Sequence, residues 1–477
     1  MGHPADCTIS KSDFLLYCEA PRHLWAAKHG LLQGEISPFV ELLIQQGYSL
    51  EELARMYLAQ SILAPNPGWR LDWQHPCEDG PFFARADALI YKPDSRSYDL
   101  YEIKSSTGVD QEHLVDVAFQ ALVLSARLKL DRLYILHLNK EYSRAEDLDL
   151  PGLFLAEDVS EKVVKLLPEV GEARQRALQV TLAADPAGLE GCLDAKNCPC
   201  PDLCHPNLPE FSIFDIPRLS KPKKQELLAA GITAARDIPD SFQLNPKQGL
   251  VRERARTNTE HINRSALRAA LAGLAFPLYF LDYETCISAI PLYPGYHPQQ
   301  QIVFQYSLHR LERPDGEAVH REHLSSGCEE PSRSLLAQLR ADIGDHGTII
   351  VWNKTFEMTC NKKMGEIHPE YATFLENLNQ RIYDLGEIIN QGIYLHPGFK
   401  GSWSIKNVLP VMVPELSYGD LAIHKGDQAS NAWWQICFGQ LPQDEKEKLK
   451  AALLCYCHLD TLAMVEIYRR FLALAAG

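Results

Sequence analysis

The chain has 477 residues, 46% of them hydrophobic and 23% charged, so it is too long for one ordinary core and lacks the bias of a disordered protein. A net charge of −15 excludes a protein that coats nucleic acid through general basicity. It does not exclude an enzyme that holds divalent cations with clustered carboxylates. We therefore expect two or three domains with local, specialised sites.

The chain shows no sign of a membrane or secreted protein. Its longest apolar runs, at 278–281 and 349–352, are far shorter than the roughly 20 residues of a membrane span. The start, MGHPADCTIS, lacks the pattern of a secretory signal. Thirteen cysteines, an odd number, suit reduced thiols and a metal site better than a disulfide framework. We expect a soluble, cytoplasmic protein.

The first 205 residues alternate helix and strand. Residues 10–62 have a helical apolar period, and two strands, 83–91 and 98–105, follow as a hairpin around a turn-rich KPDSRS. A helix is predicted at 111–126, a short strand at 132–138 and a helix at 158–182. This order predicts an α/β domain over 1–205.

A helical connector and a second α/β domain follow. Residues 206–272 are rich in proline and carry consecutive basic residues. This segment is either a helix-hairpin-helix-like element that contacts a nucleic-acid strand or a plain spacer between domains. From residue 273 the pattern predicts strands beginning with LYFLDYET, then 302–308 and 348–352, and a final helix at 445–475. The second α/β domain is therefore predicted over 273–477.

The hairpin carries a first set of charged residues. Glu102 and Lys104 share one strand face because side chains alternate across a sheet, and the turn can bring Asp87 beside Glu102. Two carboxylates bind Mg²⁺ or Mn²⁺ through oxygen, and a nearby ammonium group orients or activates water. The alternative is a surface ion pair on an edge hairpin. Downstream, Asp116 and Gln120 project from the same helix face.

The order Asp87, Glu102-Ile-Lys104, Gln120 resembles the PD-(D/E)XK nucleases of the RecB type. The resemblance implies a restriction-endonuclease-like fold, with Asp87 and Glu102 as metal ligands and Lys104 and Gln120 as catalytic residues. Leu124 stands where that family usually has tyrosine. The family's upstream histidine is also absent, and Glu51 or Glu52 is the substitute that the sequence offers.

Cysteines cluster in GCLDAKNCPCPDLC, where Cys192, Cys198 and Cys204 recur at intervals of six with Cys200 between them. Thiolates are ligands for zinc or iron–sulfur clusters, and spacing alone leaves both open. RecB-like nucleases of the AddB and CRISPR-associated type join one amino-terminal cysteine to three later ones around a [4Fe–4S] cluster. That resemblance implies Cys18, Cys192, Cys198 and Cys204 as ligands of a structural cluster, with zinc as the alternative.

A second set of acids lies in the last 200 residues. Asp282 and Glu284 share one face of an apolar strand, and acids in such a strand are costly unless paired or metal-bound. Glu357 follows another apolar strand. Tyr456 and Asp460 share one face of the last helix. Together these residues are typical of a site for two divalent ions that activates water and stabilises a leaving oxygen.

Asp282-Tyr-Glu284, Asn353-Lys-Thr-Phe-Glu357 and Tyr456-x-x-x-Asp460 resemble the motifs of DnaQ-like exonucleases of the ribonuclease H-like fold. The resemblance implies Asp282, Glu284, Glu357 and Asp460 as metal ligands and Tyr456 as a catalytic residue. Glu357 replaces the usual aspartate, and Asp384 is a candidate either to position a metal ligand or to replace one. His458 is interpreted as a structural or surface residue.

The whole order also resembles a bacterial family that fuses a RecB-like nuclease to a ribonuclease H-like domain of unknown function. We therefore expect a metal-dependent exonuclease acting on single-stranded DNA or DNA ends in repair or phage defence. Trp352, Phe356 and Trp403 are candidates for base stacking, and Ser404 and Lys406 for phosphate contact. The alternatives are a nucleic-acid-binding scaffold with one or both centres inactive, or an RNA exonuclease.

Overall fold

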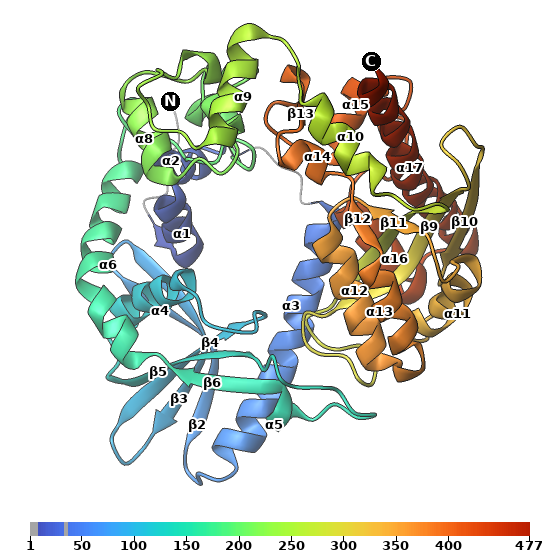
Figure 1. Cartoon of the computed structure of the whole chain (residues 1–477). Coiled ribbons are helices and arrows are strands. Elements are labelled where there is room, and N and C mark those ends of the chain that lie inside the picture. The colour runs from blue at the N-terminus through green and yellow to red at the C-terminus, as the bar shows by residue number, and fades with distance from the viewer. Residues whose placement is uncertain (1–7, 33–36) are drawn as a thin grey trace. The chain divides into compact units, whose positions relative to one another are not determined.

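The computed structural model describes residues 8–32 and 37–477 (Figure 1). It is a mixed α/β protein with two compact units. Unit 1 comprises Met1–Asn207 and Ser288–Gln300, and unit 2 comprises Leu208–Ile287 and Gln301–Gly477. The predicted connector, 206–272, thus falls almost entirely within unit 2. Most of the amino-terminal stretch that lacks a signal pattern lies outside the described residues.

Unit 1 is built on a six-stranded mixed sheet in the order β1-β3-β4-β5-β6, with β2 paired to β3. The pairs β3–β4 and β5–β6 are antiparallel, and β4–β5 is parallel. The predicted hairpin is confirmed as β3 and β4, and the predicted strand 132–138 lies within β5. The strands are β1 (Ile9–Ser10), β2 (Arg70–Asp79), β3 (Phe82–Lys92), β4 (Ser97–Lys104), β5 (Leu130–Leu138) and β6 (Phe154–Asp158).

Helices bury both faces of this sheet. Figure 1 shows α4 and α6 on one side and α3 on the other. Leu89 and Leu100 pack into the core under α4 and α6, whereas Tyr101 packs under α3. The side-chain alternation therefore puts Asp87 and Glu102 on the α4 face. The helices are α1 (Lys11–Glu19), α2 (Pro21–Lys28), α3 (Pro38–Tyr57), α4 (Gln111–Leu124), α5 (Leu150–Leu153), α6 (Ser160–Thr181) and α7 (Pro201–Cys204).

Unit 2 is built on a five-stranded mixed sheet in the order β10-β9-β8-β11-β12. β8 pairs antiparallel with β9 and parallel with β11, so the ends of β8, β11 and β12 meet at one edge. A separate two-stranded ribbon joins β7 (His261–Ile262) to β13 (Tyr394–Leu395). The sheet strands are β8 (Leu278–Ile287), β9 (Gln301–Leu311), β10 (Ala318–Leu324), β11 (Thr348–Val351) and β12 (Ile382–Asp384).

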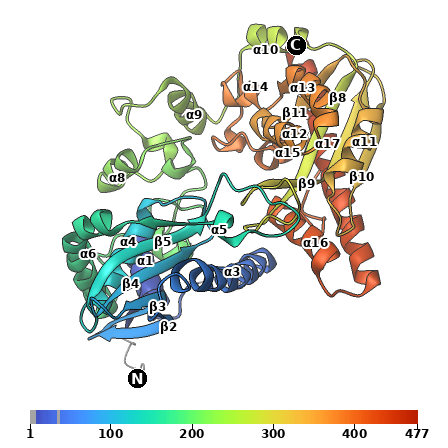
Figure 2. The ribbon, with the colours of Figure 1, turned by 90° about the horizontal axis from the view of Figure 1, so that it is seen from below.

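Two helical layers sandwich the unit 2 sheet (Figure 2). Tyr279, Leu281 and Tyr283 pack against α11, α12 and α13, so the alternate residues of β8 face α16 and α17. The helices are α8 (Lys221–Ala229), α9 (Pro246–Thr257), α10 (Arg264–Ala272), α11 (Ser332–Asp342), α12 (Lys354–Ile367), α13 (Ala372–Gln380), α14 (Glu387–Asn390), α15 (Ile405–Met412), α16 (Gly426–Phe438) and α17 (Gln443–Ala476).

The helix α17 is long and apolar enough to cross a membrane by length and composition. However, 61% of its most apolar window is buried against the rest of the structure. Its Val465 and Phe471 are fully buried. This burial is typical of a core helix.

Candidate active sites and a candidate metal centre

The first acidic site lies on the α4 face of the unit 1 sheet. Lys104 Nζ donates to Glu102 Oε1 at 2.8 Å and to Asp116 Oδ2 at 2.6 Å. Gln120 Nε2 donates to Glu102 Oε2 at 2.7 Å and to Asp116 Oδ1 at 2.9 Å. Asp87 Oδ2 accepts a hydrogen bond from the backbone of Ile103 at 2.9 Å. The structure thus brings together the residues that the RecB-like motif contains.

Lys11 supplies a second ammonium group at this site, which was not predicted from the sequence. Its Nζ lies 2.7 Å from Glu102 Oε1 and 3.6 Å from Asp116 Oδ2. Burial opposes ionisation of Glu102, yet Lys104 and Lys11 outweigh it and hold the pKa of Glu102 below its usual range. Burial and the Glu102 charge raise the pKa of Asp87 to about 8. Glu102 is therefore an ionised carboxylate whose charge is balanced by Lys104 and Lys11.

The two departures from the RecB-like pattern have structural counterparts. Leu124, at the tyrosine position, is fully buried in the core of unit 1. Glu51, on α3, is close enough for its pKa to be raised by burial and by the charge of Glu102. Gln74 Nε2 also donates to Glu51 Oε2 at 3.3 Å. Of the two suggested substitutes, Glu51 is the one whose charge acts on the site, while Glu52 is exposed.

The second acidic site lies where β8, β11 and α17 meet in unit 2. Asp282 and Glu284 are on β8, Glu357 is in the first turn of α12, and Asp460 is on α17. Asp282, Glu284 and Cys457 place ligand atoms within 4.8 Å of one another. Glu284, Glu357 and Asp460 are buried, and Glu357 Oε2 is a buried oxygen that lacks a hydrogen-bond partner among the described residues.

Mutual repulsion dominates this second site. Burial raises the pKa of Asp282 well above its usual value, and the charge of Asp460 adds to the shift. Burial and the charges of Asp282 and Asp460 act likewise on Glu284. Burial and the Asp282 charge raise the pKa of Glu357 to about 9. These carboxylates are costly to ionise without a cation, and oxygen ligands in such a group fit Mg²⁺ or Mn²⁺.

Polar groups from outside the acidic motifs complete the site. Lys406 Nζ, on α15, donates to Tyr456 Oη at 3.0 Å. Tyr418 Oη donates to Asp460 Oδ1. Burial raises the pKa of Asp460 to about 6, although Tyr418, Lys406 and Tyr456 act to lower it. Lys406 was predicted from the sequence only as a phosphate contact, and Tyr418 was not predicted, because no spacing links either residue to Asp460.

Asp384 fixes the backbone beside the acids. Its Oδ2 accepts from the Lys354 amide at 2.9 Å, and its Oδ1 accepts from the amides of Asn353 at 3.3 Å and Gly386 at 3.0 Å. Asn353, at φ 100°, has a left-handed conformation between β11 and α12. With both oxygens used, Asp384 holds the turn that presents Glu357.

Two tryptophans lie beside this turn. Trp352 Nε1 donates to the backbone oxygen of Trp403 at 3.0 Å, and both side chains are half-buried. A Cβ on Gly386 would lie 2.9 Å from the Trp403 ring and 3.2 Å from the Trp352 ring. Phe356, the third stacking candidate, instead packs against the core of unit 2.

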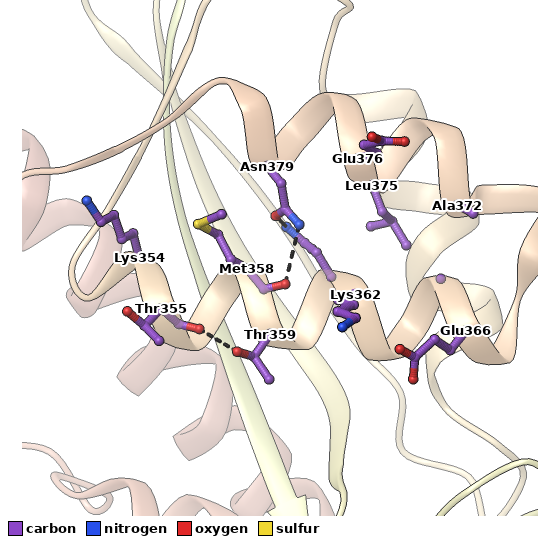
Figure 3. Close-up of a pocket in the computed structure, with 12 residues that line it drawn as sticks. Lys354, Thr355, Met358, Thr359, Lys362, Glu366, Ala372, Leu375, Glu376 and Asn379 are labelled. Carbon is purple, nitrogen blue, oxygen red and sulfur yellow. Dashed lines mark hydrogen bonds between the residues drawn. The ribbon is translucent and has the colours of Figure 1, made fainter.

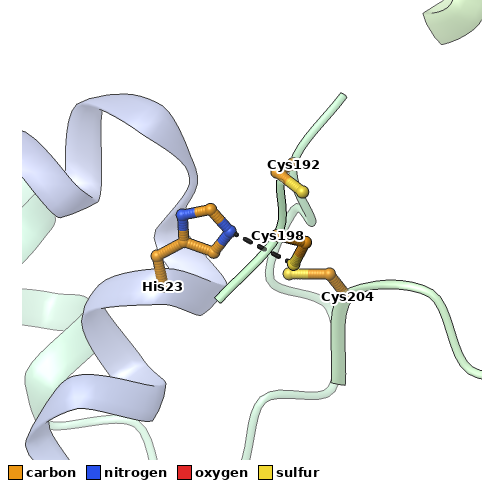
Figure 4. A group of neighbouring side chains, drawn as sticks. All are labelled: His23, Cys192, Cys198 and Cys204. Carbon is orange, nitrogen blue, oxygen red and sulfur yellow. Dashed lines mark hydrogen bonds between the residues drawn. The ribbon is translucent and has the colours of Figure 1, made fainter. Parts of the chain in front are cut away.

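The cysteine-rich segment forms a compact group with a histidine (Figure 4). The ligand atoms of His23, Cys192, Cys198 and Cys204 all lie within 4.8 Å of one another. His23 Nε2 is 3.5 Å from Cys198 Sγ, and its Nδ1 is 3.1 Å from Glu19 Oε2. A carboxylate on the second ring nitrogen is how proteins orient a metal-binding histidine. This group can bind a metal ion.

Cys18 is not part of that group, contrary to the ligand set implied by the family resemblance. The residue lies near the end of α1 with part of its surface exposed. Partial burial of its thiol, together with the charges of Glu112, Glu169 and Glu19, raises its pKa to about 11. Its surroundings are therefore acidic, whereas the next helix turns His23 toward the cysteines. Cys200 lies at the edge of the group, with its Sγ 3.7 Å from Cys204 Sγ.

A cavity of about 670 Å³ lies between α12 and α13 (Figure 3). Met358 and Leu375 give it an apolar lining, and two lysines and two glutamates, Lys354, Lys362, Glu366 and Glu376, add charges of both signs. None of the predicted acids lines it. It is therefore a surface feature of unit 2 apart from both acidic sites.

A family model described as a domain of unknown function (DUF2779) matches residues 279–404. No curated protein and no solved structure matches the chain. The matched segment runs from β8 to the residue before α15, so it contains Asp282, Glu284, Glu357 and Asp384 and ends before Asp460. The chain thus shares with that family the part of unit 2 that carries three of the four clustered acids.

Proposed function

We propose that this chain is a divalent-metal-dependent nuclease whose main catalytic centre is the acidic site of unit 2. The observation that carries the proposal is its charge balance. In four clustered carboxylates, those of Asp282, Glu284, Glu357 and Asp460, burial and repulsion among the acids outweigh the ammonium group of Lys406, which acts on Asp282, Glu284 and Asp460. In unit 1, by contrast, the carboxylates of Asp87, Glu102 and Asp116 face two ammonium groups.

The unit 2 acids would hold one or two Mg²⁺ or Mn²⁺ ions, which supply water activation and charge stabilisation at a phosphodiester. The unpartnered Oε2 of Glu357 and the repulsion between Asp282 and Asp460 fit that role. Tyr456 would orient the attacking water, since its Oη is itself positioned by Lys406. The ribonuclease H-like fold is part of this proposal, and the mixed sheet of unit 2 supports it.

The proposed substrate is a single strand or a free end of DNA, degraded exonucleolytically in repair or phage defence. The half-buried pair Trp352 and Trp403 lies beside the turn that presents Glu357. An aromatic pair in that place suits the stacking of unpaired bases, which is tolerant of sequence. RNA remains the alternative substrate, to be distinguished by direct comparison.

For unit 1 we propose a PD-(D/E)XK-type centre that binds the strand and cuts weakly or not at all. Lys104, Lys11 and Gln120 already satisfy both oxygens of Glu102. The repulsion of Glu102 with Asp87 and with Asp116 is what would still favour a cation there. This observation favours a unit 1 centre that keeps a nuclease-type fold but has reduced activity.

For the cysteine group we propose a structural zinc ion in place of the [4Fe–4S] cluster that the resemblance implies. A Cys₃His set is a known zinc environment, with Zn–S near 2.3 Å and Zn–N near 2.0–2.1 Å. Donor atoms within 4.8 Å of one another suit one tetrahedral ion. A colourless protein with stoichiometric zinc is expected, and a brown protein with broad visible absorption would contradict the assignment.

The function is tested by strand degradation with Mg²⁺ or Mn²⁺ on labelled single-stranded DNA, duplex DNA with free ends, and single-stranded RNA. Asp282→Asn should reduce the rate by at least about 100-fold, since it removes a ligand of the reacting centre. Lys104→Ala should change it little. Glu312 is an exposed acid directly after β9, so Glu312→Gln is the matched control and should be neutral.

If the wild-type chain degrades none of these substrates, the scaffold alternative stands. Activity that is unchanged in the double variant Asp282→Asn/Lys104→Ala would mean that neither site is catalytic. Loss with Lys104→Ala alone would move the main centre to unit 1. Binding of single-stranded DNA by Asp282→Asn, measured by fluorescence anisotropy, separates failure of catalysis from failure of binding.

A further inference from the structure

Three histidines of unit 2 converge outside the acidic site. His309 is on β9, His320 is on β10 directly opposite it, and His458 is on α17. Each offers a ring nitrogen, and these nitrogens lie within 4.8 Å of one another. The ring centroids are 4.6 Å apart for His309 and His320, and 4.3 Å apart for His320 and His458. Three imidazole rings from β9, β10 and α17 thus lie close together.

A chain of hydroxyl groups fixes two of these rings. His309 Nδ1 is 2.8 Å from Thr461 Oγ1, which is 2.7 Å from Ser307 Oγ, which in turn is 2.9 Å from His320 Nε2. One nitrogen of each of these two rings is engaged in this way. Hydrogen bonds of this kind set the tautomer and orientation of metal-binding histidines.

The group opens onto a cavity of about 500 Å³. His320 and His458 line it together with Glu322, Ser417 and Asp420, while His309 lies behind them with 3% of its surface exposed. Glu322 Oε2 is 3.8 Å from His320 Nε2. Three nitrogen ligands beside an accessible space are the arrangement in which zinc keeps a fourth position for water or a carboxylate.

We propose that His309, His320 and His458 form a binding site for a transition-metal dication of the zinc type, separate from the carboxylate site. Imidazole ligands select zinc, copper or nickel over Mg²⁺. One ion at Zn–N distances of about 2.0–2.1 Å would draw the nitrogens together by small ring rotations. The ion would fasten α17 to β9 and β10 at His458, two residues from Asp460.

The test is a calorimetric titration of Zn²⁺ into the purified protein, with excess Mg²⁺ to occupy the carboxylates and with the zinc already bound by the cysteines counted beforehand. Wild type should bind one further Zn²⁺. His458→Ala should weaken that binding at least tenfold, and His320→Gln should do the same. His323→Ala is the matched control, because His323 is on the same strand but outside the group and bonds to Ser325.

Cobalt gives a second readout. Co²⁺ taken up at this site should show visible d–d bands without a sulfur-to-cobalt charge-transfer band, and His458→Ala should lose them. Equal Zn²⁺ binding by wild type and His458→Ala, with both proteins equally folded by circular dichroism, would overturn the proposal. So would the absence of any zinc beyond that held by the cysteines. Neither outcome depends on nuclease activity.

Discussion

Glu102 receives hydrogen bonds from Lys11 and Lys104, and both ammonium groups are partly shielded from water. Replacing Lys11 with methionine keeps the apolar stem but removes one charged hydrogen bond from a buried carboxylate. We expect a loss of about 1–3 kcal/mol in the free energy of unfolding of unit 1, measured by urea denaturation.

The matched control for that change is Lys162→Met. Lys162 also pairs with a glutamate, Glu157, but both side chains are well exposed. A surface pair of this kind contributes about 0–1 kcal/mol. Equal effects of Lys11→Met and Lys162→Met would mean that Lys11 does not neutralise Glu102.

Glu357 makes the stability of unit 2 depend on pH. Its pKa is about 9 in the folded chain against 4.5 for an ordinary glutamate, so the folded state holds a proton that the unfolded state releases. In EDTA, the stability of unit 2 should therefore fall as pH rises between these two values. Mg²⁺ should reduce this fall by neutralising the ionised group. Differential scanning calorimetry measures both effects.

Glu357→Gln keeps the shape and removes the charge. At pH 8 in EDTA it should raise the unfolding midpoint by at least about 3 °C, since about 1 kcal/mol shifts a domain of this size by roughly 2–4 °C. The same variant should lose most of the stabilisation by Mg²⁺. A midpoint that stays at the wild-type value would show that Glu357 is not under repulsion. Glu312→Gln, which is exposed, should change neither quantity.

At the scale of elements, the turn after β12 depends on one glycine. Alanine at position 386 would place its Cβ 2.9 Å from Trp403 and 3.2 Å from Trp352. The rings must then separate, at a cost of about 1–3 kcal/mol. We expect Gly386→Ala to weaken single-stranded DNA binding severalfold in fluorescence anisotropy and to lower the unfolding midpoint.

Gly426→Ala provides the comparison, because a Cβ there meets nothing within 4 Å. It should be neutral or slightly stabilising, since alanine favours the helix that begins at this residue. If Gly386→Ala leaves strand binding at the level of Gly426→Ala, the tryptophan pair does not contact the strand.

Elements with a regular apolar period could be predicted from the sequence. The hairpin of β3 and β4 and the final helix α17 were predicted within a few residues of their observed ends. The strand β2, in contrast, was missed because its charged residues and Pro76 interrupt the alternation. The strand β10 was missed because it lies at the sheet edge, where its side chains are largely exposed.

The same distinction separates the site residues that motifs could find from those they could not. Asp282 and Glu284 share a strand, and Tyr456 and Asp460 share a helix, so their spacing predicts a common face. Lys11, His23 and Tyr418 reach their sites from separate elements through tertiary packing, which local periodicity does not encode. His23 differs from Cys18 by only five positions, yet a change of helix between them decides which side chain meets the cysteines.

At the scale of the whole molecule, the chain returns to unit 1 for residues 288–300 between β8 and β9. The backbone of Arg144 pairs with this segment, donating to Tyr296 O at 3.0 Å and accepting from Gly295 N at 2.8 Å. The Arg144 side chain donates to Pro291 O at 2.8 Å. Unit 1 is thus completed by residues that follow the whole predicted connector, which explains why boundaries drawn along the sequence could not describe it.

Because residues 288–300 belong to unit 1, we expect a fragment of residues 1–207 to be less stable than unit 1 in the full chain. The fragment lacks the buried Ala289 and the hydrogen bonds made by Arg144. We expect its urea midpoint to lie below that of unit 1, and Arg144→Ala in the full chain to reproduce about 1–2 kcal/mol of the difference. Because Arg144→Ala keeps the backbone bonds to 295–296, its effect should be smaller than that of truncation. If the fragment is as stable as unit 1 of the full chain, residues 288–300 contact unit 1 without contributing to its stability.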